Sequence, residues 1–183
     1  MKKFVFAMLF CLAAVCGVQA QENPMKYNGA VMEYKGDDAQ TKAVVDALQS
    51  VLPDVEKAFG WVAGREYISI DYSGTVTFVS GEDGAKKTTG QIFAFDQGTD
   101  SMSLGVSMDI AGKSYDFNID IYAQEDKKGA KLIFNNQEVI NAVSTIMPNA
   151  ADNDALMKVY GAISMYPEIR IGISVAVDLA SMM

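Results

Sequence analysis

Hydrophobic and polar residues alternate one by one along several long regions of this chain. The alternation runs through residues 101–110 and 114–122, and again through residues 169–179 near the end of the sequence. Successive side chains of a β-strand point to opposite faces, so each region is expected to have one apolar and one polar face. Strands of this kind are typical of an antiparallel sheet or a barrel wall that packs on one side and meets water on the other.

Shorter regions with the same period predict further strands between turn signals. They lie at residues 65–72, 75–80, 88–96 and 130–134. Glycine-containing pairs such as Asp83 and Gly84 separate them, and these pairs suit the left-handed backbone of tight hairpin turns. Residues 30–32 predict one more short strand, which we expect at an edge of the sheet.

A period of three to four residues predicts a helix early in the chain. Apolar residues recur at this spacing over residues 39–52, and Asp37 or Asp38 is suited to cap the helix. Pro53 is expected to restart the helix, because proline is tolerated in a first turn, and Gly60 is expected to end it. The start of the domain is therefore expected to be helical.

Two more helices are predicted before the last strand. The first begins at Asn135 or Asn136 and is stopped by Pro148, and the second begins at Asp152 or Asn153. The patterns together predict an α+β fold, mainly antiparallel β, in which a meandering sheet curls into a partial or closed barrel. The N-terminal helix and the helix pair are expected to plug or cover one of its ends.

The first twenty residues have the composition of a secretory signal peptide. Lys2 and Lys3 precede an apolar run over residues 4–18, and small residues ending at Ala20 form a cleavage signal. The run is shorter than the roughly 20 residues that a membrane-spanning helix needs. We therefore expect cleavage near Ala20, export to the periplasm or the extracellular medium, and a single mature domain over residues 21–183.

A lipoprotein signal is the alternative interpretation of this leader. Such signals place a small residue before the lipidated cysteine, whereas Cys16 follows Val15 and Cys11 follows Phe10. Both cysteines leave with the leader and the chain has no histidine, so the mature domain is expected to lack both residue types. These side chains most readily act as nucleophile, base or soft-metal ligand near neutral pH.

The charge balance of the chain argues against some partners. Its 23 acidic residues outnumber 15 basic ones, and loss of Lys2 and Lys3 changes the net charge from −8 to −10. Binding to a phosphate backbone needs clustered basic residues, so nucleic acid is not expected as a partner. Electrostatic repulsion argues equally against anionic membrane surfaces, and solubility is the simplest explanation of the charge.

One spacing of polar residues invites a calcium interpretation. Asp116, Asn118 and Asp120 match the start of a calcium-binding loop, but Ile121 and Lys127 stand where that loop needs glycine and glutamate. The strand pattern explains these polar residues as the wet face of a sheet. We therefore expect no metal site there.

Motifs for catalysis are not found in the sequence either. Acidic residues are numerous in the predicted turns, and no pair of them stands out as the two carboxylates of a glycosidase. Nucleophile-elbow, serine–lysine, zinc and phosphate-loop motifs do not occur. We expect a non-catalytic protein without a cofactor, and a carboxylate-dependent hydrolase with two carboxylates in one cleft is the alternative.

Residues 68–104 resemble a run found in bacterial lipocalin-like domains. Their sequence, ISIDYSGTVTFVSGEDGAKKTTGQIFAFDQGTDSMSL, has an apolar strand, a Gly-Thr turn, a strand, a basic loop and a Thr-Gly strand in the order of that family. Residues 132–173 resemble one group within it, the uncharacterised secreted domains of gut-dwelling Gram-negative bacteria. The matching positions are Leu132, Phe134, Asn135, Leu156, Tyr166, Ile169, Ile171, Gly172 and Ile173.

The resemblance implies a lipocalin-like barrel and an export route, and it brings no activity and no site residues. The chain departs from the family at one point, because the N-terminal Gly-x-Trp strand is missing. Gly60 and Trp61 stand side by side after the predicted helix instead. The sequence therefore does not decide whether the barrel is partial or closed.

Methionine and aromatic residues on the predicted apolar faces indicate where a ligand would bind. Flexible thioethers suit a pocket that adapts to apolar ligands, and they suit an irregular core equally well. The candidate cavity residues are Met102, Leu104, Met108, Phe117, Ile119 and Ile171. Others expected in or near the apolar faces are Phe93, Phe95, Tyr115, Trp61, Met147, Met157 and Met165.

These patterns support two functions of different classes. The first is an exported module that binds a small apolar or amphipathic ligand inside its curled sheet. The second is an envelope interaction or structural module without a ligand, which binds a protein partner through a surface patch or an uncovered strand edge. A cavity lined by the candidate residues would favour the first function, and an open edge would favour the second.

Overall fold

A computed structural model describes residues 25–71, 73–80, 86–124 and 128–177 of the chain. The signal peptide predicted for residues 1–20, with both cysteines, lies outside these ranges. Most of the predicted hairpin loop at residues 81–87, with its acidic pair, lies outside them as well.

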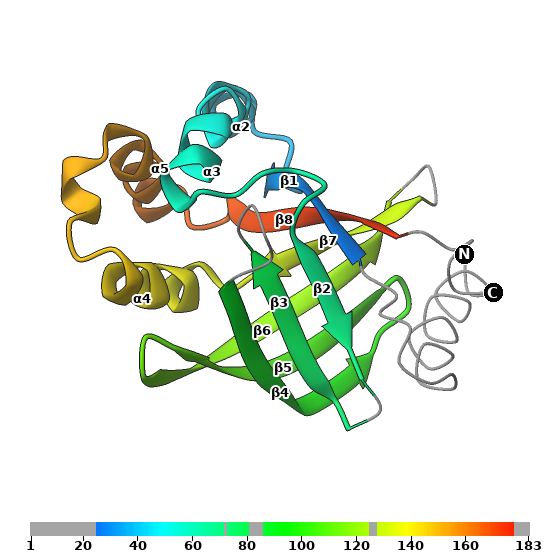
Figure 1. Ribbon diagram of the computed structural model, residues 1–183. Helices are drawn as coiled ribbons and strands as arrows, with labels where there is room; N and C mark the ends of the chain where they lie inside the picture. The colour runs from blue at the N-terminus through cyan, green and yellow to red at the C-terminus, as the bar shows by residue number, and fades with distance from the viewer. Residues whose placement is uncertain (1–24, 72, 81–85, 125–127, 178–183) are drawn as a thin grey trace.

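Eight antiparallel strands form a closed barrel in which each strand pairs with its neighbours in the sequence and the last returns to the first (Figure 1). The predicted fold is confirmed, and of the two alternatives left open the barrel is the closed one. The strands are β1 (Met25–Glu33), β2 (Tyr67–Ile70), β3 (Thr75–Ser80), β4 (Lys86–Gln97), β5 (Ser101–Ile110), β6 (Lys113–Ala123), β7 (Gly129–Phe134) and β8 (Arg170–Val177).

Closure depends on β1, and the prediction of a short edge strand at residues 30–32 is wrong. β1 is nine residues long, pairs with β8 along nearly its whole length, and pairs with β2 through its first two residues. A bulge interrupts the ladder between Tyr27 and Gly29, where Gly29 has a φ of 130°. The bulge and the polar residues around it break the two-residue period, so the pattern reveals only the last part of the strand.

The most regular strands are those with the clearest alternation. β5 and β6 pair in unbroken register, and a tight turn joins them at Ala111 and Gly112, both with positive φ. Their apolar side chains point into the barrel, because they belong to one buried cluster, and the polar side chains between them point outward. The predicted dry and wet faces of these two strands are confirmed.

One apolar cluster fills the barrel. Val106, Ala130 and Val175 are fully or almost fully buried in it. Removal of apolar surface from water is the main term that stabilises such a core, at about 25 cal/mol per Å². The other buried members are Ile68, Met102, Leu104, Phe117, Ile119, Ile121, Leu132 and Ala142.

Two helices follow β1, α2 (Ala39–Gln49) and α3 (Leu52–Phe59). Asp38 caps α2 by accepting a hydrogen bond of 2.7 Å from the N–H of Thr41, and the hydrogen bonds from Thr41 lower the pKa of the Asp38 carboxyl. Pro53 stands in the first turn of α3, and Gly60 ends α3 with a φ of 69°. The predicted restart is confirmed, although the first helix stops at Gln49 instead of continuing to residue 52.

The predicted helix pair precedes the last strand. It consists of α4 (Asn136–Ile146) and α5 (Asp154–Met165), with the short 3-10 helix η1 (Ala150–Asp152) between them. The side-chain oxygens of Asn135 and Asn153 cap the two helices by accepting backbone hydrogen bonds. Figure 1 shows α2, α3 and α5 gathered near β1 and β8, while α4 lies apart from them toward β6.

The helices cover one end of the barrel, as predicted. A second apolar cluster joins α2, α3 and α5 to the ends of β1 and β8, with Ile169 fully buried at its centre. A third, smaller cluster joins α4 to α5. The further buried members of the second cluster are Met32, Val45, Leu48, Leu52, Val159 and Ile163.

Four residues expected near the apolar faces are exposed instead. Phe93 and Phe95 of β4 are 59% and 53% exposed, and Met157 and Met165 of α5 are 45% and 75% exposed. A bulge shifts the register of β4 beside Phe93, and β3 does not extend far enough to cover either ring. Met157 and Met165 lie on the solvent side of α5, because its buried residues are on the other side.

Candidate functional site

Five of the six candidate cavity residues lie in the barrel interior. Four of them belong to the buried cluster, and Met108 packs against it while partly exposed. Ile171 lies elsewhere, partly buried in the cluster between the barrel and the helices. The five interior residues are Met102, Leu104, Met108, Phe117 and Ile119.

The deep part of the interior leaves little surface for a ligand. Met102 and Leu104 expose only 2% and 6% of their surface, and their neighbours in the cluster are covered to a similar degree. Side chains enclosed on all sides are packed at the density of an ordinary protein core. A ligand is therefore expected nearer an end of the barrel, where the lining residues keep exposed surface.

The end of the barrel near α4 has apolar lining residues of this kind. Val76, Met108 and Tyr115 lie in one row across β3, β5 and β6. Phe78 and Ile110 lie nearer the end of their strands, and all five residues are partly exposed while packed against the interior cluster. We call these five residues the mouth of the barrel.

Gly90 of β4 keeps the middle of the mouth free of a side chain. It stands in the row between Val76 and Met108. A Cβ at this position would lie 2.6 Å from the Cγ of Met108 and 2.7 Å from the carbonyl oxygen of Ser107. The glycine therefore allows the flexible thioether side chain of Met108 to approach β4 closely.

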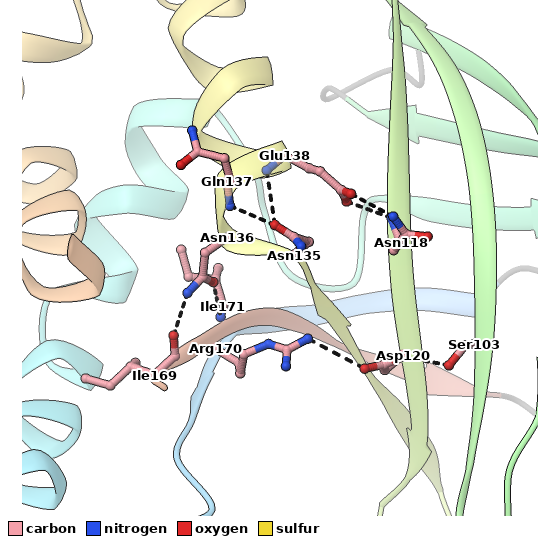
Figure 2. Close-up of polar contacts among 10 residues, drawn as sticks. All are labelled: Ser103, Asn118, Asp120, Asn135, Asn136, Gln137, Glu138, Ile169, Arg170 and Ile171. Atoms are coloured by element: carbon pink, nitrogen blue, oxygen red, sulfur yellow. Dashed lines mark hydrogen bonds and ion pairs between the residues drawn. The ribbon is translucent and has the colours of Figure 1, made fainter. Parts of the chain in front are cut away.

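Helix α4 covers part of the mouth. Ala142 of α4 is 3% exposed and belongs to the interior cluster, and the hydroxyl of Tyr115 donates to Oγ1 of Thr145. Asn118 donates two hydrogen bonds of 2.7 Å, from its backbone N–H and its side-chain amide, to the two carboxylate oxygens of Glu138 (Figure 2). α4 is thus held to β6 while it presents a small side chain to the interior.

Asn136 ties the start of α4 to β8. Its Nδ2 donates to the carbonyl oxygen of Ile169 at 2.6 Å, and its Oδ1 accepts from the N–H of Ile171 at 3.1 Å (Figure 2). The side chain satisfies two backbone groups just where β8 begins. α4 therefore starts from a fixed point beside the barrel end.

The calcium-like spacing at residues 116–120 lies on the outer face of β6, and two of its members, Asn118 and Asp120, have other partners. Asp120 accepts from the hydroxyl of Ser103 at 2.6 Å and pairs with Arg170 at 3.6 Å, while Asn118 is engaged with Glu138 (Figure 2). In the described part of the chain, no group of three His, Cys, Asp or Glu residues is placed to hold a metal ion.

A buried polar cluster at the bulge of β1 was not predicted. The Tyr27 hydroxyl donates to Oε1 of Glu56 at 2.9 Å, and the same oxygen accepts from the N–H of Ala30 at 2.5 Å. Glu66 is 1% exposed; its Oε1 accepts from the N–H of Val62, and its Oε2 is buried with no hydrogen-bond partner among the described residues. Burial raises the pKa of Tyr27, and the hydrogen bond to Glu56 and the charges of Glu56 and Glu66 raise it further.

Glu56 and Glu66 bear on the hydrolase alternative, because they are two carboxylates near one tyrosine. Oε1 of Glu56 accepts hydrogen bonds from Tyr27 and Ala30 of β1. Oε2 of Glu66 has no hydrogen-bond partner among the described residues and is closed to solvent. The carboxylate of Glu56 thus connects α3 to β1, while the carboxylate of Glu66 bonds within the loop after α3. No signal in the sequence separates these two residues from ordinary surface acids, since burial depends on the fold around them.

Trp61 connects this cluster to the mouth. Its ring is stacked on Phe59 with 4.9 Å between ring centroids, and it meets Tyr27 and Phe78 edge-on at 5.5 and 6.1 Å. Phe78 belongs to the mouth, and Trp61 is the one tryptophan in the sequence. The fluorescence of the chain is therefore expected to respond to events at the mouth.

Comparison with known proteins gives no relative of this chain. No protein-family model matches it, and no curated protein and no solved structure matches it. The architecture, a closed eight-stranded antiparallel barrel with covering helices, is consistent with a lipocalin-like barrel. Among the residues that the structure describes, no helix has the length and apolar character needed to cross a bilayer.

Proposed function

We propose that this chain is an exported, non-catalytic lipocalin-like module that binds a small amphipathic ligand at the mouth of its barrel. The supporting observation is the partial exposure of the five mouth residues above a packed interior. Ligand sites are mostly apolar and concave, with a few polar groups that set orientation. Export is supported by the leader pattern of residues 1–20, and the family by the resemblance over residues 68–173.

Two lysines at the rim favour a ligand with an anionic head group. Lys86 pairs with Ser80 at the end of β3, and Lys113 pairs with Ile110 at the end of β5. Residues directly opposite each other in an antiparallel ladder share a face, so Lys113 stands on the interior side of the sheet with Ile110. In an acidic chain, two exposed cations at this place favour a carboxylate or phosphate there.

The test is a titration of the full chain with cis-parinaric acid, a fluorescent fatty acid, followed by its emission and by quenching of Trp61. Ala142→Leu enlarges the side chain that α4 presents to the interior, and it is expected to weaken binding about tenfold, the effect of a small change of volume in an apolar site. Its control is Ser144→Leu, which enlarges a side chain on the exposed side of the same helix. This control is expected to bind like the natural chain.

Two further measurements separate the parts of the proposal. Palmitate is expected to displace the probe more strongly than hexadecanol, and a double change of Lys86→Ala and Lys113→Ala is expected to remove that preference. Met108→Ala enlarges the mouth and is expected to change the affinity for cis-parinaric acid. Thermal unfolding checks that this variant is folded. Equal binding by Ala142→Leu and Ser144→Leu, or no response of Trp61, would contradict a site at the mouth.

A further inference from the structure

Part of β4 has no neighbouring strand on one side. β3 pairs with β4 only as far as Gln91, and the chain then turns at residues 73–74 toward β2. β4 continues to Gln97 and is paired there with β5 alone. Among the described residues no strand lies against the other side of Phe93–Gln97, so the hairpin of β4 and β5 presents an open edge. This edge lies at the end of the barrel opposite to the mouth.

Two phenylalanine rings are exposed along this edge. Phe93 lies over Gly105, where a Cβ would be 2.7 Å from the ring, and this contact places Phe93 on the outer face. Phe95 pairs with Leu104 and therefore shares the interior side of the sheet. The two rings lie on opposite sides of the same strand, and all residues over 93–100 are exposed.

The open edge is also acidic. Asp96 and Asp100 are exposed in the hairpin, and Asp71 stands in the adjoining turn between β2 and β3. Hydrogen bonds within that turn lower the pKa of Asp71, so its carboxylate is charged at neutral pH. Residues 88–112 contain no lysine or arginine that would neutralise these charges locally.

We propose that the edge Phe93–Gln97 binds an extended basic segment of a protein partner, which adds a strand to β4. The free N–H and C=O groups of an edge strand pair readily with an incoming strand. Successive side chains of that segment point to opposite faces, so one set would contact Phe93 and the other set would contact Phe95. Its cations would pair with Asp96 and Asp100. A second copy of this chain would bring the same carboxylates to the edge, and like-charge repulsion disfavours it.

The test measures fluorescence anisotropy with the full chain and a fluorescein-labelled peptide of alternating valine and threonine with lysines at both ends. One matched peptide has glutamate in place of lysine, and another has N-methyl groups on alternate backbone nitrogens. The lysine peptide is expected to bind at least about tenfold more tightly than either matched peptide, and more weakly as salt rises. Equal binding by the N-methylated peptide would overturn strand addition.

Variants of the chain locate the binding. Phe95→Ser and Asp96→Lys are each expected to weaken peptide binding by about fivefold or more, a typical effect for an interface contact. Asp109→Lys makes the same charge change at the far end of β5 and is expected to have little effect, as is Ala142→Leu at the mouth. Loss of binding in Ala142→Leu alone, or a dimer in sedimentation that Phe95→Ser abolishes, would refute the proposed partner. Circular dichroism checks that each variant is folded.

Discussion

The two sides of the barrel are packed to different degrees although they are built from similar residues. In the side made by β5 to β8, apolar residues such as Val106 and Val175 are almost completely buried. In the side made by β2 to β4, Val76, Phe78 and Ile92 are all partly exposed. We refer to these as the tight wall and the loose wall.

Strand length and helix placement explain the difference. β5 and β6 are ten and eleven residues long, whereas β2 has four residues and pairs with β1 through two of them. The helices have their most extensive strand contacts with β1 and β6, and they also pack on β8. The tight wall therefore supplies most of the packed core, while the open edge of β4 lies in the loose wall. The mouth takes Val76 and Phe78 from the loose wall and Met108, Ile110 and Tyr115 from the ends of the tight wall.

The largest expected effect comes from matched phenylalanine truncations in the two walls. Phe117→Ala removes a buried ring from the tight wall and is expected to lower the free energy of unfolding by about 4 kcal/mol, in the range for buried aromatics. Phe78→Ala in the loose wall is expected to lower it by about 2 kcal/mol, because that ring is already partly exposed.

Urea unfolding of both variants measures this difference. The slope of the unfolding free energy against urea concentration should be the same in both variants. A different slope would indicate altered compactness of the folded or unfolded state. Equal losses of unfolding free energy in the two variants would show that both walls contribute equally to stability, and would contradict the distinction between them.

A smaller effect is expected where α4 is fixed to the tight wall. Asn136→Ala leaves the carbonyl of Ile169 and the N–H of Ile171 without their partner. Unpartnered buried backbone groups are expected to lower the free energy of unfolding by about 2 kcal/mol. Asn141→Ala, an exposed position on the same helix, is the control, and thermal unfolding should place it close to the natural chain.

The smallest effect concerns pH at the seam between the walls. The pKa of Tyr27 is raised in the folded chain, chiefly by burial and then by Glu56, so above pH 10 the folded state keeps a proton that the unfolded state releases. The stabilisation is present below pH 10 and is lost as pH rises, by up to about 1.4 kcal/mol per pH unit. Urea unfolding between pH 8 and 11 measures it, and Tyr27→Phe should show a shallower decline.

The regular parts of the fold could be predicted because local pattern and tertiary environment agree there. The alternation in β5 and β6 marks the barrel interior correctly, and Asn135 and Asp38 cap the helices that their positions predicted. β1 was predicted only over residues 30–32 and as an edge strand, because its bulge at Gly29 disturbs the period on which the prediction depends.

The candidate site was predictable only in part. The pattern shows that Met102, Leu104 and Met108 share a face, but it does not show which of them keeps exposed surface. Met108 stays partly exposed because it lies near an end of its strand. The exposure of Phe95 has a similar cause, since β3 ends before it can cover that ring.

Periodicity and neighbouring residues were enough to predict most of the antiparallel strands and the helix boundaries within a few residues. The tertiary structure decided that the barrel closes, that Glu66 is buried, and that Phe93 and Phe95 are exposed. These outcomes depend on where strands of unequal length end against one another. That alignment is set by pairing between residues far apart in the chain, which no local pattern records.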